Sequence, residues 1–356
     1  MKNVPEKLLK KNSTAFYTFD ISLLKERIQY LRNQLPSSVS LCYAVKANTF
    51  LIRELAETVE RFEICSPGEA EICAFLGIPS EKMVISGVYK TPSFIEGLLV
   101  DPCFKGIFTV ESLLQYELLC KAPPKEEPIS LLLRLTNDSQ FGINEEDIER
   151  ILANRNAFPH IHILGIQFFS GTQKTSAKKL KREIEHLDMF LQHLKESYAY
   201  EAEELEYGPG FPITYFSADV SKEEELFKEL SESLCAMKIR PKITLELGRS
   251  IAASCGRYYT HIVDMKRNKG QNYLLVDGGM HHLVYYGQHM AMKQPYFSVV
   301  GKENEPAEET WNICGSLCSM NDILVKQAPL PHIAIGDMLC FHNTGAYCMT
   351  EGISLF

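Results

Sequence analysis

Lys46 ends an apolar run in the sequence YAVKAN, residues 43–48. Burial at a strand end disfavours an ammonium ion and lowers its pKa, so a lysine in this position can act as a nucleophilic amine. The alternative is an ordinary surface lysine whose amine extends into water. Other residues along the chain must decide between these two interpretations.

Several other polar groups complement such an amine. The glycines of GPG (208–210) allow an anion to approach the backbone, and SGTQ (170–173) adds a hydroxyl and amide groups. Arg249 supplies a cation, and Glu246 can hold a proton on a ring nitrogen. Lys46 can form an imine with an aldehyde. Pyridoxal 5′-phosphate (PLP) combines a phosphate, a ring nitrogen and an aldehyde, so these residues predict a PLP site.

These residues lie at the ends of short apolar runs, most of which are followed by a helical pattern or a polar loop. Eight strands that alternate with helices predict an α/β fold, a (β/α)8 TIM barrel with its active site at the C-terminal ends of the strands. A doubly wound open sheet is the alternative. Ser66 ends the second run, and Arg134 lies at the end of the fifth. The runs are VSLCYAV (39–45), RFEICS (61–66), MVISG (83–87), GIFTV (106–110), ISLLLRL (129–135), ILGIQFF (163–169), ELEYG (204–208) and KITLEL (242–247).

The pattern changes after about residue 255, where short alternating strands and turn signals replace the helical periodicity. The runs YYTHIVDMKR, QNYLLVDGG, WNICGSLC and DMLCFHNTGAY predict a C-terminal all-β domain, and AFYTFD (15–20) is a strand that could join it. We expect a PLP-binding TIM barrel over 21–253. We expect a β-domain of Greek-key or β-barrel-like type, with shortened last strands, over 1–20 and 254–356.

Composition limits the classes of partner. The net charge of −8 argues against nucleic acid and against an anionic membrane surface, since both require a basic face. The N-terminal stretch has no long apolar segment and no later run has the length of a membrane span, so we expect a cytoplasmic protein. The 11 cysteines form no CxxC pairs, which favours reduced thiols over a disulfide framework.

Motifs in collinear order over nearly the whole chain resemble the fold-type III PLP-dependent decarboxylases, relatives of the ornithine, arginine and diaminopimelate decarboxylases with an alanine-racemase-like barrel. The resemblance extends from about residue 15 to the end. The motifs are YAVKAN (43–48), EICSPGE (63–69), RL with FG (134–142), SGTQ (170–173), GPGFP (208–212), ELGRS (246–250), VDGGM (276–280), CGSLCSMND (314–322) and TGAY (344–347).

The resemblance implies a role for each matching residue. Lys46 would carry the cofactor as an internal aldimine, and Glu246 would pair with the pyridinium nitrogen, so that the ring stabilises a quinonoid intermediate after CO2 departs. Cys318 would reach the site from a partner subunit and help to protonate the reacting carbon, which implies a homodimer with shared active sites. The expected phosphate contacts are Thr172, Gly208, Gly210, Gly248, Arg249 and Tyr347.

The sequence departs from the family pattern at several positions. Phe169 stands where a histidine usually stacks on the cofactor ring, and Pro209 lacks the N–H that a glycine would offer to the phosphate. Ser319 replaces an acidic residue, and a neutral hydroxyl cannot compensate a buried distal ammonium. Free ornithine, lysine and diaminopimelate are therefore disfavoured substrates.

The run DGGMHH (277–282) looks closer to a subgroup from biosynthetic gene clusters, which includes a decarboxylase of a carrier-protein-bound glutamyl group. We expect Arg134, Ser319, His281 and His282 to contact the substrate. Adjacent histidines on a strand point to opposite faces, so we expect no metal site there.

The leading hypothesis is PLP-dependent decarboxylation of the α-carboxylate of an amino acid or of an amino-acid-derived substrate, free or bound to a carrier protein. An amino-acid racemase of the same fold is one alternative, although CGSLC favours the decarboxylase. A non-catalytic regulatory homologue is the other alternative.

Overall fold

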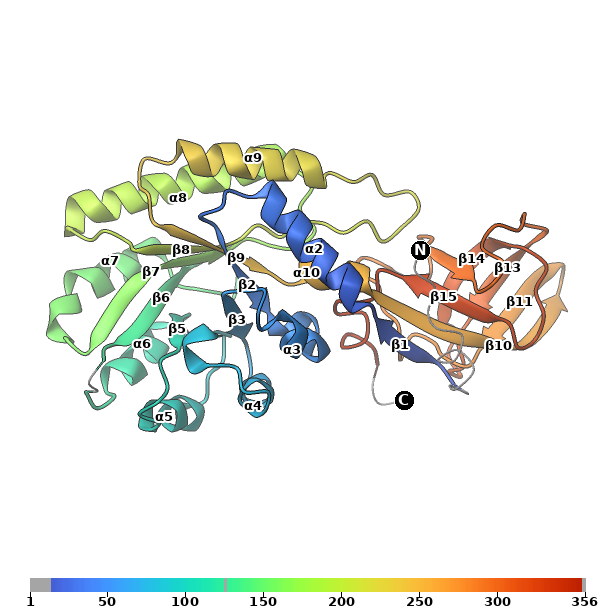
Figure 1. The fold of residues 1–356 in the computed structure, drawn as a ribbon, viewed down its shortest axis with the longest axis horizontal. Helices are drawn as coiled ribbons and strands as arrows, with labels where there is room; N and C mark the ends of the chain where they lie inside the picture. The colour runs from blue at the N-terminus through green and yellow to red at the C-terminus, as the bar shows by residue number, and fades with distance from the viewer. Residues whose placement is uncertain (1–13, 125–126, 354–356) are drawn as a thin grey trace. The chain divides into compact units, whose positions relative to one another are not determined.

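The structure, a computed structural model, describes residues 14–124 and 127–353. The chain divides into two compact units. One contains Ile28–Pro212 and Lys222–Ile251 and is called the barrel unit (Figure 1). The other, called the β-rich unit, contains the described residues up to Arg27, the segment Ile213–Ser221 and the described residues from Ala252 onward.

Eight parallel strands close into a barrel, which confirms the predicted architecture and excludes an open sheet (Figure 1). The closure joins the first of these strands to the last, with Ser40 opposite Thr244 and Tyr43 opposite Leu247. Each predicted run corresponds to one strand of the barrel, and only β7 extends beyond its run, by two residues at the start. The strands are β2 (Ser40–Ala44), β3 (Arg61–Ile64), β4 (Met83–Ile85), β5 (Ile107–Val110), β6 (Ile129–Leu135), β7 (Ile161–Phe169), β8 (Glu204–Gly208) and β9 (Lys242–Leu247).

Helices lie on the outside of these strands, and several begin at a side-chain cap (Figure 1). The hydroxyls of Ser66, Ser112 and Ser176 each accept a hydrogen bond from the backbone N–H three residues later. Ser66 therefore serves as a helix cap at the end of the second strand. The helices are α2 (Ile21–Gln34), α3 (Ile52–Leu55), α4 (Pro67–Phe75), α5 (Pro92–Val100), α6 (Leu113–Cys120), α7 (Glu145–Ala153), α8 (Ala177–Tyr198), α9 (Glu223–Ala236) and α10 (Arg249–Ala252).

The interior of the barrel has an apolar layer and a polar part. Cys42, Val84, Ile107 and Leu132 pack together as a buried cluster, and Leu164 packs against them. Elsewhere, polar residues alternate with apolar ones along the strands, so the polar set faces inward while its neighbours pack under the helices. The buried polar residues on the barrel strands include Glu63, Thr109, Arg134, Gln167, Glu206, Thr244 and Glu246.

Glu206 is a buried carboxyl group in this polar part. One of its oxygens accepts a hydrogen bond of 2.6 Å from the Gln167 amide. Burial raises the pKa of Glu206 to about 7, because the negative charges of Glu204 and Glu63 act with burial against the opposing charge of Arg61. The group is therefore neutral at moderately acid pH and becomes charged near neutrality.

The β-rich unit contains a seven-stranded sheet in the order β12-β15-β10-β11-β13-β14, with β1 paired to β10. Phe16 lies opposite Tyr259, which confirms that the AFYTFD strand joins this sheet. The sequence analysis missed two strands, β12 and β14, since one is short and the other contains Pro329. The strands are β1 (Phe16–Phe19), β10 (Gly256–Asn268), β11 (Gln271–Val276), β12 (Phe297–Val299), β13 (Glu309–Cys314), β14 (Ile323–Leu330) and β15 (Met338–His342).

Glu206→Gln should reduce the pH dependence of stability. Between about pH 4.5 and 7 the unfolded chain loses the Glu206 proton while the folded chain keeps it, so folded-state stability falls as pH rises. A shift of this size corresponds to at most about 3 kcal/mol in the free energy of unfolding. Calorimetric unfolding at pH 5 and pH 8 should show a smaller loss for the variant. Glu196→Gln, an exposed carboxyl on α8, is the matched control and should behave like the wild type.

Candidate active site

Lys46 lies two residues beyond the end of β2, in a single turn of 3₁₀ helix (Val45–Ala47) at the C-terminal end of the barrel. Its Nζ donates to Glu63 Oε2 at 2.9 Å and lies 3.4 Å from Cys65 Sγ and 3.9 Å from Glu246 Oε1. The side chain is 41% exposed, and a buried carboxylate holds its amine. This combination is that of a positioned reactive amine.

The residues around Lys46 fix the local backbone. The Tyr43 hydroxyl donates to the Asn48 carbonyl at 3.0 Å, and the Asn48 side chain accepts from Phe50 N at 2.9 Å. Tyr43 is fully buried in the barrel wall and Asn48 is nearly so. The motif YAVKAN therefore works as a unit in which tyrosine and asparagine hold the turn that presents the lysine.

Glu63 and Glu246 are buried carboxyl groups on neighbouring sides of the lysine amine. Burial raises the pKa of Glu246 well above its usual value, and the charge of Glu63 adds to this effect. For Glu63, burial also acts upward, but the positive charges of Lys46 and Arg134 outweigh it and lower the pKa. Glu63 is thus the anion of the pair, and Glu246 holds a proton.

The loops after β7 and β8 meet at two glycines. A Cβ atom at Gly210 would lie 2.0 Å from the Gly171 carbonyl oxygen, and one at Gly208 would lie 2.3 Å from the Phe169 ring. Gly210 also adopts φ +63°, which favours glycine. The Phe169 ring therefore packs against β8. Thr172 directly follows Gly171 and is half-buried. Gly210 is therefore held against Gly171, which directly precedes Thr172 in the other loop.

Gly248 and Arg249 follow β9 directly, next in sequence to the proton-holding Glu246. Arg249 is only 6% exposed and begins the short helix α10, while the Gly248 carbonyl accepts from Ile251 N at 3.1 Å. A buried guanidinium at this strand end supplies the cation that the sequence analysis expects there.

Arg134 lies inside the barrel wall. Its guanidinium forms an ion pair of 3.1 Å with Glu111 and lies 4.7 Å from the centre of the Phe141 ring. It is 5% exposed, and its charge contributes to the lowered pKa of Glu63. The structure thus places Arg134 in the charge network beneath the lysine; a direct contact with substrate stays a prediction.

Five of the expected site residues lie in the β-rich unit: Cys318, Ser319, His281, His282 and Tyr347. Cys318 is exposed and Ser319 is half-buried, and both occupy the loop between β13 and β14. Their roles stay predictions.

Asp322 holds this loop. Its two carboxylate oxygens accept from Met280 N at 2.7 Å and Leu317 N at 2.8 Å, and the residue is 2% exposed. Gly279 and Gly315 allow the close approach, since a Cβ atom at either would lie within 2.5 Å of the carboxylate. The carboxylate thus ties the loop with Cys318 to the DGGM turn.

The two histidines differ from their expected arrangement. His281 and His282 lie in a turn rather than on a strand, and their ring centres are 3.8 Å apart. The prediction that they point to opposite faces is wrong, because β11 ends at Val276 and the alternation of side chains ends with it. In the described part of the chain, no group of three or more His, Cys, Asp or Glu side chains is arranged to hold a metal ion.

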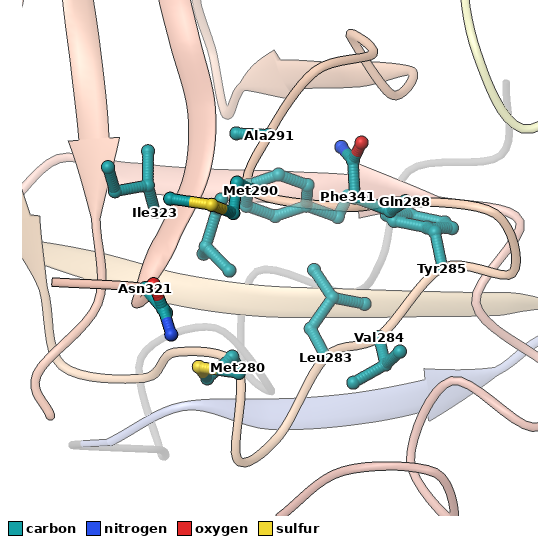
Figure 2. A pocket seen from close by; sticks show the side chains of 11 residues that line it. Met280, Leu283, Val284, Tyr285, Gln288, Met290, Ala291, Asn321, Ile323 and Phe341 are labelled. Carbon is teal, nitrogen blue, oxygen red and sulfur yellow. The ribbon is translucent and has the colours of Figure 1, made fainter. Parts of the chain in front are cut away.

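An apolar recess lies in the β-rich unit beside the same segments (Figure 2). Its lining includes Met280, Leu283, Met290, Ile323 and Phe341. The polar groups of the lining are largely engaged elsewhere, because the Tyr285 hydroxyl donates to the His342 carbonyl and the Gln288 amide to the Lys293 carbonyl. The recess therefore suits an uncharged group.

Comparison with known proteins assigns the family. Residues 21–253, more than half of the chain, match the family described as pyridoxal-dependent decarboxylase, pyridoxal binding domain. The chain belongs to this family. The protein is a PLP-dependent decarboxylase, and the resemblance and the cofactor predicted from its motifs are confirmed. Among the described residues, none of the enzyme's helices is long and apolar enough to cross a bilayer.

Individual relatives cover most of the enzyme. An L-glutamyl-[BtrI acyl-carrier protein] decarboxylase of Niallia circulans is 24% identical over 96% of this chain and 85% of its own length. A diaminopimelate decarboxylase of Aquifex aeolicus is 25% identical over 94% of this chain and 82% of its own length. The crystal structure of a lysine/ornithine decarboxylase from Vibrio vulnificus, complexed with cadaverine, has the same fold, with a TM-score of 0.85 and 22% identity over 98% and 92% of the chains.

The residues of the enzyme's barrel fit PLP. Glu246 Oε2 is buried and has no hydrogen-bond partner among the described residues, which suits a ligand that supplies one. Lys46, whose side chain is 41% exposed, offers an amine, and the glycine contacts at 208 and 210 offer a narrow backbone cradle. These features match the aldehyde, ring nitrogen and phosphate of the cofactor.

Glu63, Glu111 and Asp322 were missed as members of the site by the sequence analysis. Glu63 lies in the motif EICSPGE, and a charged residue between Phe62 and Ile64 in an apolar strand was a usable signal. Glu111 and Asp322 gave no such signal, because each acts through a partner far away in the sequence.

Asp322→Asn should destabilise the β-rich unit, because an amide can accept one of the two backbone hydrogen bonds but cannot replace the charge. We expect a loss of about 2 kcal/mol in the free energy of unfolding. Trp311, the single tryptophan, lies on β13 of this unit, so its fluorescence during urea unfolding measures the effect directly. Asn321→Ala, at an exposed neighbour, should change stability by less than about 0.5 kcal/mol. Equal stability of Asp322→Asn and wild type would contradict the assigned role.

Proposed function

We propose that the enzyme removes the α-carboxylate of an amino acid or of an amino-acid-derived substrate, with Lys46 as the residue that binds the cofactor aldehyde. The observation that carries this proposal is the position of the Lys46 amine at the C-terminal end of the barrel, 2.9 Å from Glu63 and 3.9 Å from a proton-holding Glu246. Family membership supports amino-acid decarboxylation, and this geometry supports the residue roles.

Different residues of the barrel are assigned to different parts of the cofactor. Glu246, with its proton and its unpartnered oxygen, would hold the ring nitrogen, and this would keep the ring electron-poor. Phe169 would pack beside the ring in place of the expected histidine. When bound, PLP withdraws electrons from the bond between the α-carbon and the carboxylate. The phosphate is assigned to Thr172, Gly208, Gly210, Gly248, Arg249 and Tyr347.

The enzyme is proposed to act as a homodimer, in which Cys318 of one chain serves the Lys46 site of the other. Cys318 is exposed on a loop that Asp322 fixes, as a residue that enters a partner's site must be. Its thiol would deliver a proton to the α-carbon after CO2 departs. Such a role requires the loop to be ordered and the thiol to be accessible.

The substrate is proposed to lack a distal ammonium group. Ser319 offers a neutral hydroxyl where a carboxylate would be needed to compensate a buried cation. The nearby recess is apolar, with Met280 after the DGG turn and Asn321 two residues after Ser319. The Niallia circulans relative acts on a glutamyl group of an acyl-carrier protein, so a carrier-bound substrate belongs among the first to be tested. His281, His282 and Arg134 are kept as proposed substrate contacts.

Lys46→Ala should abolish covalent attachment of the cofactor. In the wild type, borohydride should fix PLP to the peptide that contains Lys46, because reduction turns the imine bond into a stable amine. Mass spectrometry of the digested protein identifies the modified residue, and visible absorbance follows the imine. An unchanged absorbance spectrum in Lys46→Ala would overturn the assignment.

Cys318→Ala is the matched control for this experiment. It should keep the absorbance and the borohydride product while it loses about 10²–10⁴-fold in product formation, the usual contribution of a general acid. A mixture of Lys46→Ala and Cys318→Ala chains should recover part of the turnover if the cysteine acts across a dimer. No recovery in re-formed mixed dimers would contradict a shared site.

A substrate panel should separate the proposed substrates. We expect CO2 release from substrates without a distal ammonium, and little from free ornithine, lysine or diaminopimelate. The panel compares free glutamate and other neutral or acidic amino acids with glutamyl groups bound to a carrier protein. Ser319→Asp should improve the diamino substrates relative to the others, since it restores a compensating charge. Deuterium uptake from solvent at the α-carbon without CO2 release would instead indicate racemisation.

A further inference from the structure

Glu183 on α8 is a buried carboxylate with three side-chain partners. It accepts from Lys174 Nζ at 2.6 Å, from the Tyr207 hydroxyl at 2.7 Å and from the Ser170 hydroxyl at 2.5 Å. Glu183 and Lys174 are 9% and 7% exposed, and Tyr207 is fully buried. The three partners and Glu183 are called the Glu183 cluster. None of its members is assigned a role in the reaction above.

The partners of Glu183 surround both glycine loops of the candidate site. Ser170 and Lys174 stand at the two ends of the loop that contains Gly171 and Thr172, and Tyr207 directly precedes Gly208. The carboxylate therefore binds three points on two segments, one after β7 and the other at the end of β8. A single group on a helix sets the spacing of the two loops.

The loops also contact each other at the cluster. Lys174 N donates to the Gly210 carbonyl at 3.0 Å, and a Cβ atom at Gly210 would lie 3.3 Å from Lys174 Cε. The lysine side chain thus runs beneath Gly210 on its way to Glu183. Movement of Lys174 would displace the Gly210 backbone, which packs so closely on the first loop that a Cβ atom at Gly210 would lie only 2.0 Å from the Gly171 carbonyl oxygen.

Electrostatics make this arrangement dependent on Glu183. Burial lowers the pKa of Lys174, and the charge of Glu183 opposes this and favours the ammonium ion. Without the carboxylate, the buried ammonium and the Tyr207 hydroxyl would both lose their acceptor. The loop after β8 also has Pro209 in place of an amide donor, so the remaining donors must be well placed.

We propose that Glu183 is a positioning residue for the cofactor phosphate, which acts by holding the Ser170–Lys174 loop and the Gly208–Gly210 loop at the spacing that the phosphate requires. The proposal rests on the assignment of these loops to the phosphate under the proposed function. Glu183 does not touch the cofactor in this role; it acts through Lys174, Ser170 and Tyr207.

The test compares PLP with pyridoxal, which lacks the phosphate. The full-length chain, freed of cofactor, is titrated with each compound. The readout is the dissociation constant of pyridoxal divided by that of PLP, a ratio that measures the preference for PLP. Glu183→Gln should weaken PLP binding roughly tenfold, which corresponds to one charge-assisted hydrogen bond. Pyridoxal binding should stay within about twofold, because Lys46 and Glu246 are untouched.

Two further variants keep the test decisive. Tyr207→Phe removes one hydroxyl from the cluster and preserves the ring, so it should lower the preference for PLP in the same direction by a smaller factor. Asp188→Asn is the matched control, since Asp188 is a buried carboxylate of the same helix that accepts from Lys238 N and Ile239 N, away from both loops. It should leave the ratio unchanged.

Each outcome has a defined meaning. A ratio that falls in Glu183→Gln and Tyr207→Phe but not in Asp188→Asn supports the proposal. Equal weakening of PLP and pyridoxal, or the same change of ratio in Asp188→Asn, overturns it, because both indicate general loss of structure. A wild-type protein that does not prefer PLP to pyridoxal would instead contradict the phosphate assignment of the proposed function.

Discussion

The ion pair between Lys46 and Glu63 is the interaction on which the rest of the candidate site depends. A buried carboxylate is tolerated only when a partner compensates its charge, and here the partner is the Lys46 amine, to which we assign the cofactor aldehyde. The anion in turn keeps a proton on Glu246, because two neighbouring carboxyl groups do not both ionise in a buried site. Arg134 and Glu111 form a further ion pair in the same network, so positive and negative side chains alternate within the barrel.

The barrel makes this network possible because its strands carry polar residues on the inward face and apolar residues on the outward face. Closure brings β2 beside both β3 and β9, which places Lys46 between two carboxyl groups that are 183 positions apart in the sequence. The glycine loops are proposed to bind the phosphate, which needs exposed backbone that side chains would block. Glu183 anchors these glycine loops to the helix α8, because its carboxylate accepts from Lys174 at the end of one loop.

In the β-rich unit, the loop that contains two expected site residues is fixed by a carboxylate for which no ligand contact is expected. Cys318 and Ser319 are exposed or half-buried on a loop with little regular structure, and the Asp322 carboxylate fixes that loop through backbone N–H groups. His281 and His282 were expected on a strand, and the turn after β11 instead brings their ring centres to 3.8 Å from each other. Because a turn stands where a strand was expected, the two side chains lie close together instead of pointing to opposite faces.

The sequence by itself determined the barrel, the AFYTFD strand in the second sheet, the family and the cofactor, because apolar periodicity, glycine positions and collinear motifs are local signals. It also singled out Lys46 and Glu246, which the structure brings to within 3.9 Å of each other. The tertiary structure decided that Glu63 is the partner of Lys46, that Asp322 fixes the cysteine loop and that Glu183 joins the glycine loops. These contacts form only once the barrel and the sheet have brought their segments together. Local sequence does not indicate which buried charged residues will be neighbours in the fold.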